Sequence, residues 1–359
     1  MMKHAPRLSR PPPGASPGTL VIDPAAPPPV IEVIAYGPDG FLEIKAADPE
    51  SAFQEVGKHQ VVWINVEGVG DEKTMLRLGE LFGLHPLAIE DVVHPHQRIK
   101  VAEFDTHLFI IARMIVTGVQ TEQLSLFLGN NYLLTFQEKT GGDAFEPVRE
   151  RLRNGRGRSR RSGPDYLAYA LFDALIDGYF PVLETIGEEL DALEEDVLAL
   201  PARSTIGRIH DIKRQLILLR RSIWPLRETA NALIRDETRF IQPETRPFFR
   251  NCYDHCAQLI DLTENHRDLA SELSDLYLSS AGHELNASLK VPTIITILFM
   301  PLSFIAAIYG MNFSPGASHW NTPELRWYWG YPFALVLMAT VILTVGVYSW
   351  RKGRNERRK

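Results

Sequence analysis

Two long stretches near the end of the chain are apolar and uncharged. No Asp, Glu, Lys or Arg lies between Lys290 and Glu324, and the apolar part of this interval is Val291–Met311. As a helix it would be about 31 Å long, which is enough to cross the hydrocarbon core of a bilayer. A second such run is Tyr331–Trp350. The pattern predicts a first transmembrane helix, an external loop and a second transmembrane helix, over residues 291–312, 313–329 and 330–350.

The first part of the chain has the pattern of a soluble domain with strands and helices. Four short runs rich in β-branched and aromatic residues are typical of strands, and two segments have helical spacing. The expected strands are Ile31–Ile34, Val61–Val66, Leu108–Ile111 and Tyr132–Phe136, and the expected helices are Met75–Phe82 and Phe145–Arg153. We therefore expect an α/β domain over residues 31–160. Residues 1–30 contain nine prolines, which predicts a disordered tail.

The middle of the chain is helical in pattern and predicts a stalk domain over residues 161–290. An acidic segment, 184–196, precedes a basic one, 203–221, and the two are expected to form an antiparallel helix pair. A single helix is expected from about residue 248 to residue 311, because its prolines at 292 and 301 are tolerated within a membrane bundle. At about 96 Å this helix is far longer than one membrane span.

One face of this long helix is polar even within the membrane. Steps alternating between three and four residues define the face that a helix turns towards parallel copies of itself. From the end of the stalk through the first span this face carries Asn286, Leu289, Thr293, Thr296, Met300, Ser303, Ala307 and Gly310. A polar seam in an apolar helix predicts a pore wall. Rings of Leu289 and Met300 are expected to act as hydrophobic gates that stop conduction by dewetting.

Towards the N-terminus the same face becomes acidic. It carries Asn251, Asp254, Gln258, Asp261, Asn265, Asp268, Glu272, Asp275, Ser279 and Gly282. The ordinary interpretation is the wet side of an amphipathic helix, but such a side normally includes Lys or Arg, and this one has neither. In a symmetric ring every subunit repeats each acid, and carboxylate rings at Asp268 and Asp275 would concentrate cations.

Charge and composition narrow the function further. The basic residues of the segment 351–359 place that end in the cytoplasm by the positive-inside rule, and two spans return the N-terminus to the same side. The arginine-rich segment 149–161 has no interleaved aromatic residues, so no nucleic-acid partner is expected. The chain has no phosphate-binding loop and no nucleophile motif, so we expect no enzyme. Cys252 and Cys256 are the only cysteines and are expected to be reduced packing thiols.

The triplet Gly310-Met311-Asn312 at the end of the first span resembles the signature of the CorA family of magnesium channels. The surrounding residues are also similar to that family, in the segments 85–91, 223–227, 286–290, 299–306 and 323–332. The resemblance implies a two-span homopentamer in the bacterial inner membrane. Its cytoplasmic part would consist of an α/β domain and a helical funnel. The two spans would contact the lipid bilayer. The transported ions would be hydrated Mg²⁺, Co²⁺ and Ni²⁺. Rings of Asn312 amides and Gly310 carbonyls would hold the water shell of the ion.

The resemblance also implies closure by intracellular Mg²⁺ that binds between subunits. The positions expected to hold this ion are Glu90, Asp91, Asp173, Asn251, Asp254 and His255. Without the resemblance, Glu90 and Asp91, in a stretch with His85, His94 and His96, would be interpreted as ordinary surface acids and histidines. Asn251 stands where the family usually has an aspartate, which predicts weaker closure unless Asp254 or His255 substitutes.

Two further departures concern the span itself. Leu289 replaces a methionine that is common at the family's constriction, and Pro292 replaces a usual leucine, which removes a backbone donor and favours a bend.

Two other functions remain open. One is a zinc or general divalent cation transporter of the same superfamily, and the other is a membrane-anchored metal sensor that does not conduct.

Overall fold

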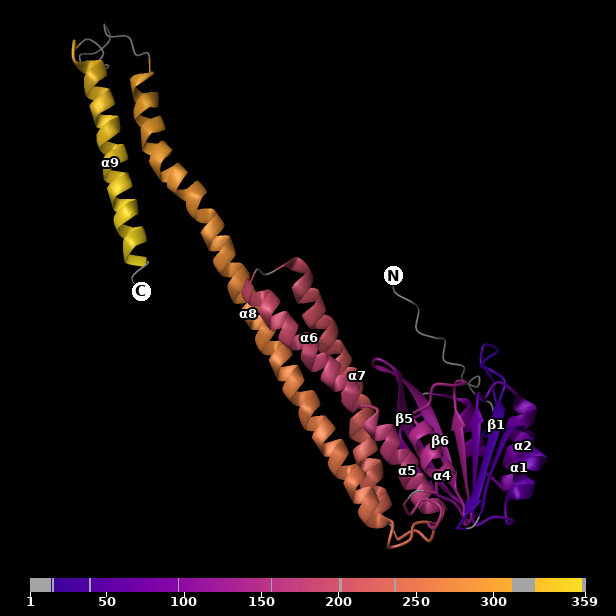
Figure 1. Ribbon diagram of the computed structural model, residues 1–359. Helices are drawn as coiled ribbons and strands as arrows, with labels where there is room; N and C mark the ends of the chain where they lie inside the picture. The colour runs from indigo at the N-terminus through magenta and orange to yellow at the C-terminus, as the bar shows by residue number, and fades with distance from the viewer. Residues whose placement is uncertain are drawn as a thin grey trace. The chain divides into compact units, whose positions relative to one another are not determined.

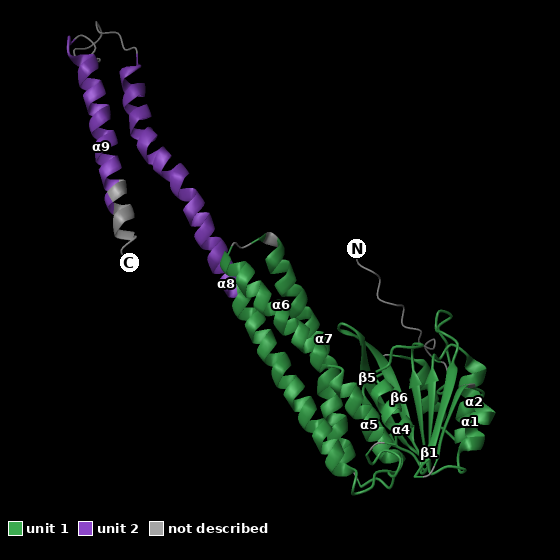
Figure 2. Cartoon of the chain, in the orientation of Figure 1, with its two compact units in different colours: residues 1–274 green, residues 275–359 purple. Residues whose placement is uncertain are grey.

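The computed structural model (Figure 1) divides into two units, residues 1–274 and 275–359 (Figure 2). The boundary falls within one continuous helix, so each unit takes part of it. Asn312 and residues 313–326 of the predicted external loop lie outside the described residues. The structure describes residues 14, 16–38, 40–95, 97–155, 157–199, 202–235, 237–311 and 327–356.

Unit 1 begins with a seven-stranded sheet in the order β2-β1-β3-β7-β6-β5-β4. The strands are β1 Val30–Gly37, β2 Gly40–Ala47, β3 Val61–Glu67, β4 Lys100–Glu103, β5 Leu108–Thr117, β6 Gln120–Leu128 and β7 Tyr132–Gln137. β3 and β7 pair in parallel, and the other neighbouring pairs are antiparallel. The four strands expected from the sequence are confirmed, although each is longer than its apolar run.

Helices cover the sheet. The helices on one side are α1 Pro49–Glu55, α2 Glu72–Phe82 and α3 Pro86–Val93, and they share a hydrophobic core with the sheet. α4 Glu146–Arg153 and α5 Pro164–Asp177 follow the last strand, and α5 contacts four of the strands. Burial on both faces explains why the central strands are nearly continuous in apolar residues rather than alternating.

The N-terminal segment corrects one prediction. We expected disorder up to residue 30, yet Leu20, Ile22 and Ala26 pack against the core of the α/β domain. The Gly70 amide donates to the Pro27 carbonyl, with a nitrogen–oxygen distance of 2.9 Å. A Cβ at Gly70 would lie 2.2 Å from the Ala26 carbonyl oxygen. The N-terminal segment can therefore pack this closely only because residue 70 has no side chain. The prediction of disorder rested on the proline content of the segment. It did not take into account that three apolar side chains of the segment can pack on the domain.

The rest of unit 1 is a bundle of long helices. It contains α6 Phe180–Ala199, α7 Arg203–Arg235 and the first part of α8 Arg246–Tyr309. The expected pairing of an acidic helix with a basic one is confirmed, since Arg208 of α7 lies 3.0 Å from Asp196 and 3.7 Å from Glu189 of α6. These side chains are exposed, so the ion pairs contribute little, and buried apolar residues hold the helices together.

Unit 2 contains the remainder of α8 and α9 Gly330–Glu356. Among the described residues, three helical stretches have the length and hydropathy to cross a membrane: Pro164–Ala199, Arg246–Tyr309 and Gly330–Tyr348. Half of the most apolar window of the first is buried inside the protein, whereas the other two windows are 0% and 11% buried. Exposed apolar surface on this scale requires a partner, which here is a bilayer or other spans. α8 and α9 are therefore the transmembrane helices, as the sequence predicted.

Candidate functional site

The acidic face of α8 is exposed in unit 1. The register predicted from the sequence selects seven positions between residues 251 and 274, and all seven are exposed; Leu269 is the only other exposed residue in that stretch. The intervening Cys252, Cys256 and Leu259 are fully buried against the neighbouring helices. The positions on the exposed face are Asn251, Asp254, Gln258, Asp261, Asn265, Asp268 and Glu272. The predicted register therefore coincides with the solvent-exposed face of the helix in unit 1. On this face, Asp268 accepts hydrogen bonds from the adjacent Arg267.

In unit 2 the predicted pore positions are also exposed, but so are most of their neighbours. Those positions are Asp275, Asn286, Leu289, Thr293, Thr296, Met300, Ser303, Ala307, Gly310 and Met311. An isolated span has no partner to cover any of its sides, so exposure does not distinguish one face here. The assignment of these residues to a pore remains a prediction.

Two threonines on this face have a defined hydrogen-bonding state. The Thr293 hydroxyl donates to the Leu289 carbonyl at 2.7 Å, and the Thr296 hydroxyl donates to the Pro292 carbonyl at 2.9 Å. A hydroxyl has one proton and two acceptor lone pairs. Because the proton of each is used within the helix, each hydroxyl oxygen presents only acceptor capacity to its surroundings.

α8 ends at the motif that the sequence singled out. The Gly310 amide donates to the Ala306 carbonyl at 2.9 Å, and the Met311 amide donates to the Ile308 carbonyl at 3.2 Å. A Cβ at Gly310 would lie 3.2 Å from the Ala306 carbonyl oxygen, closer than an ordinary contact. Glycine therefore suits the position directly after the last residue of the helix.

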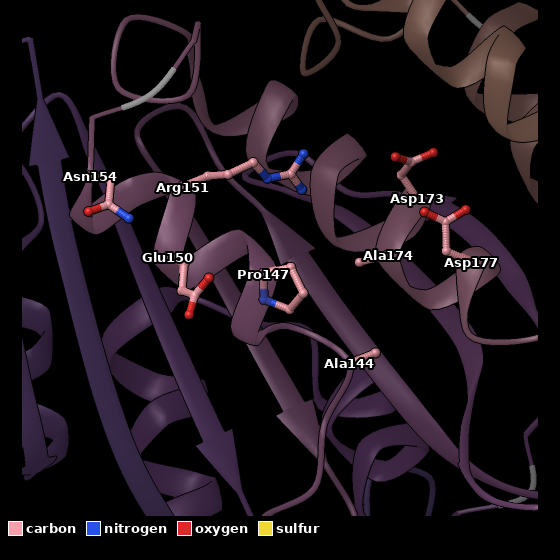
Figure 3. A pocket seen from close by; sticks show the side chains of 8 residues that line it. All are labelled: Ala144, Pro147, Glu150, Arg151, Asn154, Asp173, Ala174 and Asp177. Carbon is pink, nitrogen blue, oxygen red and sulfur yellow. The ribbon is translucent and has the colours of Figure 1, made fainter. Parts of the chain in front are cut away.

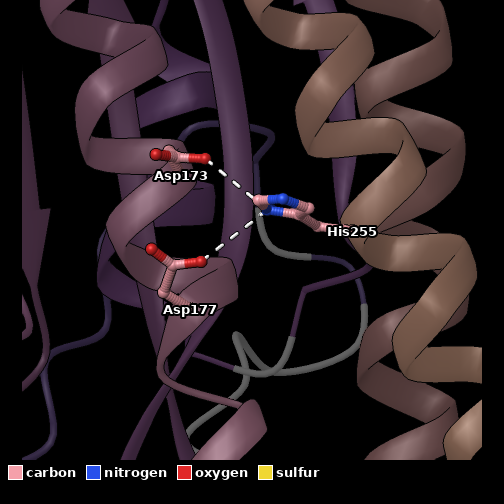
Figure 4. A group of neighbouring side chains, drawn as sticks. All are labelled: Asp173, Asp177 and His255. Atoms are coloured by element: carbon pink, nitrogen blue, oxygen red, sulfur yellow. Dashed lines mark ion pairs between the residues drawn. The ribbon is translucent and has the colours of Figure 1, made fainter.

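A group of metal-ligating side chains lies between α5 and α8 (Figure 4). It consists of Asp173, Asp177 and His255, whose nearest ligand atoms all lie within 4.8 Å of one another. Nδ1 of His255 is 3.8 Å from Asp173 Oδ1 and 3.7 Å from Asp177 Oδ1. Asp173 and Asp177 are four residues apart on α5, so both carboxylates lie on the side of the helix that faces α8.

The surroundings of this group are partly polar. The Asn251 amide lies 3.3 Å from Nε2 of His255, and the Tyr169 hydroxyl donates to Asp173 at 3.4 Å. Burial, and then the nearby Asp177 carboxylate, raise the pKa of Asp173 above its usual value. Burial also raises the pKa of the Cys252 thiol, and raises that of Cys256 to about 12. Both cysteines are free and buried, as expected for packing thiols.

The two aspartates also border a pocket of 440 Å³ (Figure 3). The pocket lies between α4 and α5, and Figure 3 shows the Asp173 and Asp177 side chains at one end of it. Its other polar lining residues come from α4 and the turn after it, and they are Glu150, Arg151 and Asn154. The pocket gives solvent and small ions a route to the carboxylates.

The other predicted regulatory acids have different partners. Asp91 on α3 lies 2.5 Å from the Lys100 ammonium of β4, and Glu90 accepts a hydrogen bond of 2.7 Å from the Gly18 amide. Within the residues that the structure describes, neither carboxylate belongs to the group formed by Asp173, Asp177 and His255. Asp254 is exposed and also lies outside that group. Of the predicted set, the structure thus brings together Asp173, His255 and the adjacent Asn251.

Sequence reasoning missed Asp177. Its signal was its position four residues after Asp173 in a helical segment, which places both acids on one face. That signal alone is weak, because only the fold shows that His255 lies opposite them.

These features define a two-span membrane protein with an α/β domain, an acid-faced helix and a group of metal-ligating side chains. The chain belongs to the CorA-like Mg²⁺ transporter family, whose model matches residues 58–352. Members of this family are transporters and not enzymes.

Relatives and solved structures agree with this assignment. The chain is 46% identical over 327 residues to the cobalt/magnesium transport protein CorA of Thermotoga maritima, covering 90% of this chain and 91% of the relative. It is 33% identical to the putative metal ion transporter YfjQ of Bacillus subtilis, over 81% of this chain and 89% of the relative. The structure of the CorA magnesium transporter from Methanocaldococcus jannaschii has the same fold, with a TM-score of 0.74 at 22% identity, covering 90% of this chain and 97% of that chain.

Proposed function

We propose that this chain forms a homopentameric channel that conducts Mg²⁺ into the cytoplasm and also carries Co²⁺ and Ni²⁺. The channel would lie in the bacterial inner membrane, with both termini in the cytoplasm. The Thermotoga relative is named for cobalt and magnesium transport, which supports the choice of ions. Ni²⁺ is included for its chemical similarity to Co²⁺.

The observation that carries this proposal is the single polar face of α8. In unit 1 that face is exposed, bears acids and has no Lys or Arg. The same helix continues without interruption to Tyr309, and the same register then carries polar and small side chains. A membrane anchor needs no polar seam, whereas a pore built from parallel helices needs a continuous one.

Conduction would keep the water shell of the ion, because Mg²⁺ dehydrates reluctantly. The first-shell waters of a cation point their hydrogens outward and therefore need acceptors. Thr293 and Thr296 present acceptor oxygens, since their own protons are held by the backbone. Rings of these hydroxyls would stabilise a hydrated cation and give no comparable stabilisation to a hydrated anion.

The other positions on this face would act in sequence along the pore. Gly310, Met311 and Asn312 would capture the hydrated ion at the external end. Leu289 and Met300 would form dry barriers when the pore is closed, and carboxylate rings at Asp268 and Asp275 would collect cations at the cytoplasmic end.

Closure would follow from Mg²⁺ bound between subunits. Glu90 and Asp91 of one subunit would approach Asp173, Asn251, Asp254 and His255 of the next. Mg²⁺ would have to compete with the Lys100 ammonium for Asp91. Such competition sets the ion concentration at which the channel closes.

Flux through liposomes tests the proposal. Purified protein is reconstituted with an ion-sensitive dye inside, and Mg²⁺, Co²⁺, Ni²⁺ and Zn²⁺ are added outside in turn. We expect Mg²⁺, Co²⁺ and Ni²⁺ to enter liposomes that contain the native protein. We expect none of the three to enter liposomes that contain Asn312→Ala. Entry of Zn²⁺ with exclusion of Mg²⁺ would favour a zinc transporter, and no flux of any ion would favour a metal sensor.

A further inference from the structure

A groove lies between α7 and the part of α8 that belongs to unit 1. Its volume is 620 Å³, and Leu216, Ile217 and Trp224 supply apolar lining. Ile217 is 49% exposed and Trp224 is 42% exposed. Two bulky apolar side chains of a stalk helix are therefore left in contact with solvent, in a groove large enough to receive a side chain of a partner.

The exposed side of α7 is basic as well as apolar. Alternating steps of four and three residues select six positions along α7, and all six are exposed. Arg220 and Arg267 add two guanidinium groups to the groove, and the acid of the groove, Glu264, lies 3.4 Å from Arg220. An acidic surface that carries an apolar side chain would complement this groove. The six exposed positions are His210, Arg214, Ile217, Arg221, Trp224 and Glu228.

The acidic face of α8 has this combination. Leu269 is 45% exposed at the edge of that face, Asp268 precedes it directly, and Glu272 follows it by about one turn. Leu269 comes two residues after Arg267, which lines the groove, so it points about 200° away from Arg267 around the helix. Within its own chain Leu269 therefore cannot enter the groove.

Leu269 nevertheless lies at the level of the groove along the stalk. α7 and α8 run in opposite directions, because Lys213 Nζ is 3.3 Å from Ser274 Oγ whereas Arg220 is 3.4 Å from Glu264. Leu269 is midway along α8 between Glu264 and Ser274, and the groove lies between the same two contacts on α7. Copies of the chain arranged around an axis parallel to α8 share one level, so Leu269 of one copy would lie beside the groove of the next.

We propose that Leu269 of each subunit inserts into this groove of the next subunit, beside Ile217 and Trp224, and that Glu272 pairs with Arg214. A groove on one side of the chain and a projecting side chain on the other give a head-to-tail contact, which closes into a ring. The contact removes three exposed apolar side chains from water and brings acids to a basic surface. It rests on the proposed homopentamer and names the surfaces that join its stalks.

Cross-linking of the full-length protein in lipid nanodiscs tests the contact. In Ile217→Cys with Leu269→Cys, mild oxidation should link neighbouring chains, which a non-reducing gel resolves as a ladder of multiples of one chain. Either substitution alone should give no ladder, and the native Cys252 and Cys256 should not react because they are buried. Leu198→Cys with Leu269→Cys is the control, because Leu198 is 66% exposed on α6 and does not line the groove.

Exchange of charges tests the ionic part of the contact. Arg214→Glu and Glu272→Arg should each raise severalfold the concentration at which the oligomer dissociates, and the two together should restore the native value, because the paired charges are again opposite. The mass of the particles over a dilution series measures this concentration. Losses that add in the double variant, or an oligomer of native mass without the cross-linked ladder, would overturn the contact and leave the proposed channel standing. A native protein with the mass of one chain would overturn the proposed homopentamer and the contact with it.

Discussion

The Lys100 ammonium lies 2.5 Å from the Asp91 carboxylate, so a carboxylate expected to bind Mg²⁺ is already paired with a cation of its own chain. Lys100 is 42% exposed and the pair can exchange with solvent ions. An exposed pair of this kind contributes at most about 1 kcal/mol. It is strong enough to adjust the affinity of Asp91 for Mg²⁺ and too weak to prevent binding.

Replacing this lysine should make the proposed channel close at lower Mg²⁺. In Lys100→Gln, Asp91 loses its competing cation, and the threshold for closure should fall by up to about fivefold, which corresponds to about 1 kcal/mol. The measurement is current in planar bilayers at a series of Mg²⁺ concentrations on the cytoplasmic side. Lys45→Gln is the matched control, because Lys45 is more exposed and lies 3.8 Å from Glu43 of its own strand. An unchanged threshold in Lys100→Gln would remove Asp91 from the regulatory site.

Asn251→Asp should also lower the threshold for closure. The new carboxylate would lie beside His255, with a charge that attracts Mg²⁺ more than the neutral amide does. A net gain of about 1.4 kcal/mol per site would lower the threshold about tenfold. Gln258→Glu is the control, since it adds an acid to the same exposed face two helical turns away. The same shift in both variants would show a general effect of charge and no specific site.

Sequence and structure agree best where a pattern is local and continuous. The exposed face of α8 follows from the spacing of Asp254, Asp261 and Asp268, because a helix repeats its geometry without help from the rest of the chain. The two spans follow from uncharged runs for the same reason. Physical periodicity is enough to predict such features.

The sequence was less informative where the result depends on contacts between distant segments. Gly18 contacts Glu90 across 72 positions, and Asp177 faces a histidine on a helix that begins much later in the chain. Neither contact leaves a periodic trace, because each depends on how the sheet and helices pack. The family resemblance named Asp173 but gave no indication of Asp177.

Thr296→Val should reduce Mg²⁺ flux while preserving the helix. Valine has the shape of threonine but lacks the oxygen that would accept a hydrogen bond from a water of the hydrated ion. Thr340→Val is a close control, because Thr340 lies on α9 and its hydroxyl makes the same bond to the carbonyl four residues earlier, at 2.8 Å. We expect a severalfold loss of flux in Thr296→Val and little change in Thr340→Val. Equal losses would mean that the threonines support the helices and do not line a pore.

Two buried groups of the α/β domain should give opposite pH dependences of stability. Burial lowers the pKa of His107 from 6.5 to about 4, and burial, followed by the charge of Glu138, raises the pKa of Glu122 to about 7. His107 binds a proton more readily in the unfolded state than in the folded state. Its contribution to the free energy of unfolding is therefore complete above about pH 6.5 and is lost as the pH falls towards 4. Glu122 holds its proton more tightly when folded, so its contribution is complete below its unfolded pKa of 4.5 and is lost as the pH rises through about 7.

Single substitutions should therefore separate the two slopes. In His107→Phe the aromatic contacts with Phe104 and Phe127 can be kept, and the free energy of unfolding should fall steadily from about pH 4.5 to about pH 7. In Glu122→Gln the free energy of unfolding should instead rise between about pH 4 and about pH 6.5, by up to about 3 kcal/mol, because only the effect of His107 remains. Urea unfolding of the full chain at several pH values, followed by tryptophan fluorescence, measures both, with His210→Phe as an exposed control. Slopes of the same sign in the two variants would contradict the assignment, because only a lowered histidine pKa and a raised carboxyl pKa give opposite proton uptake on unfolding.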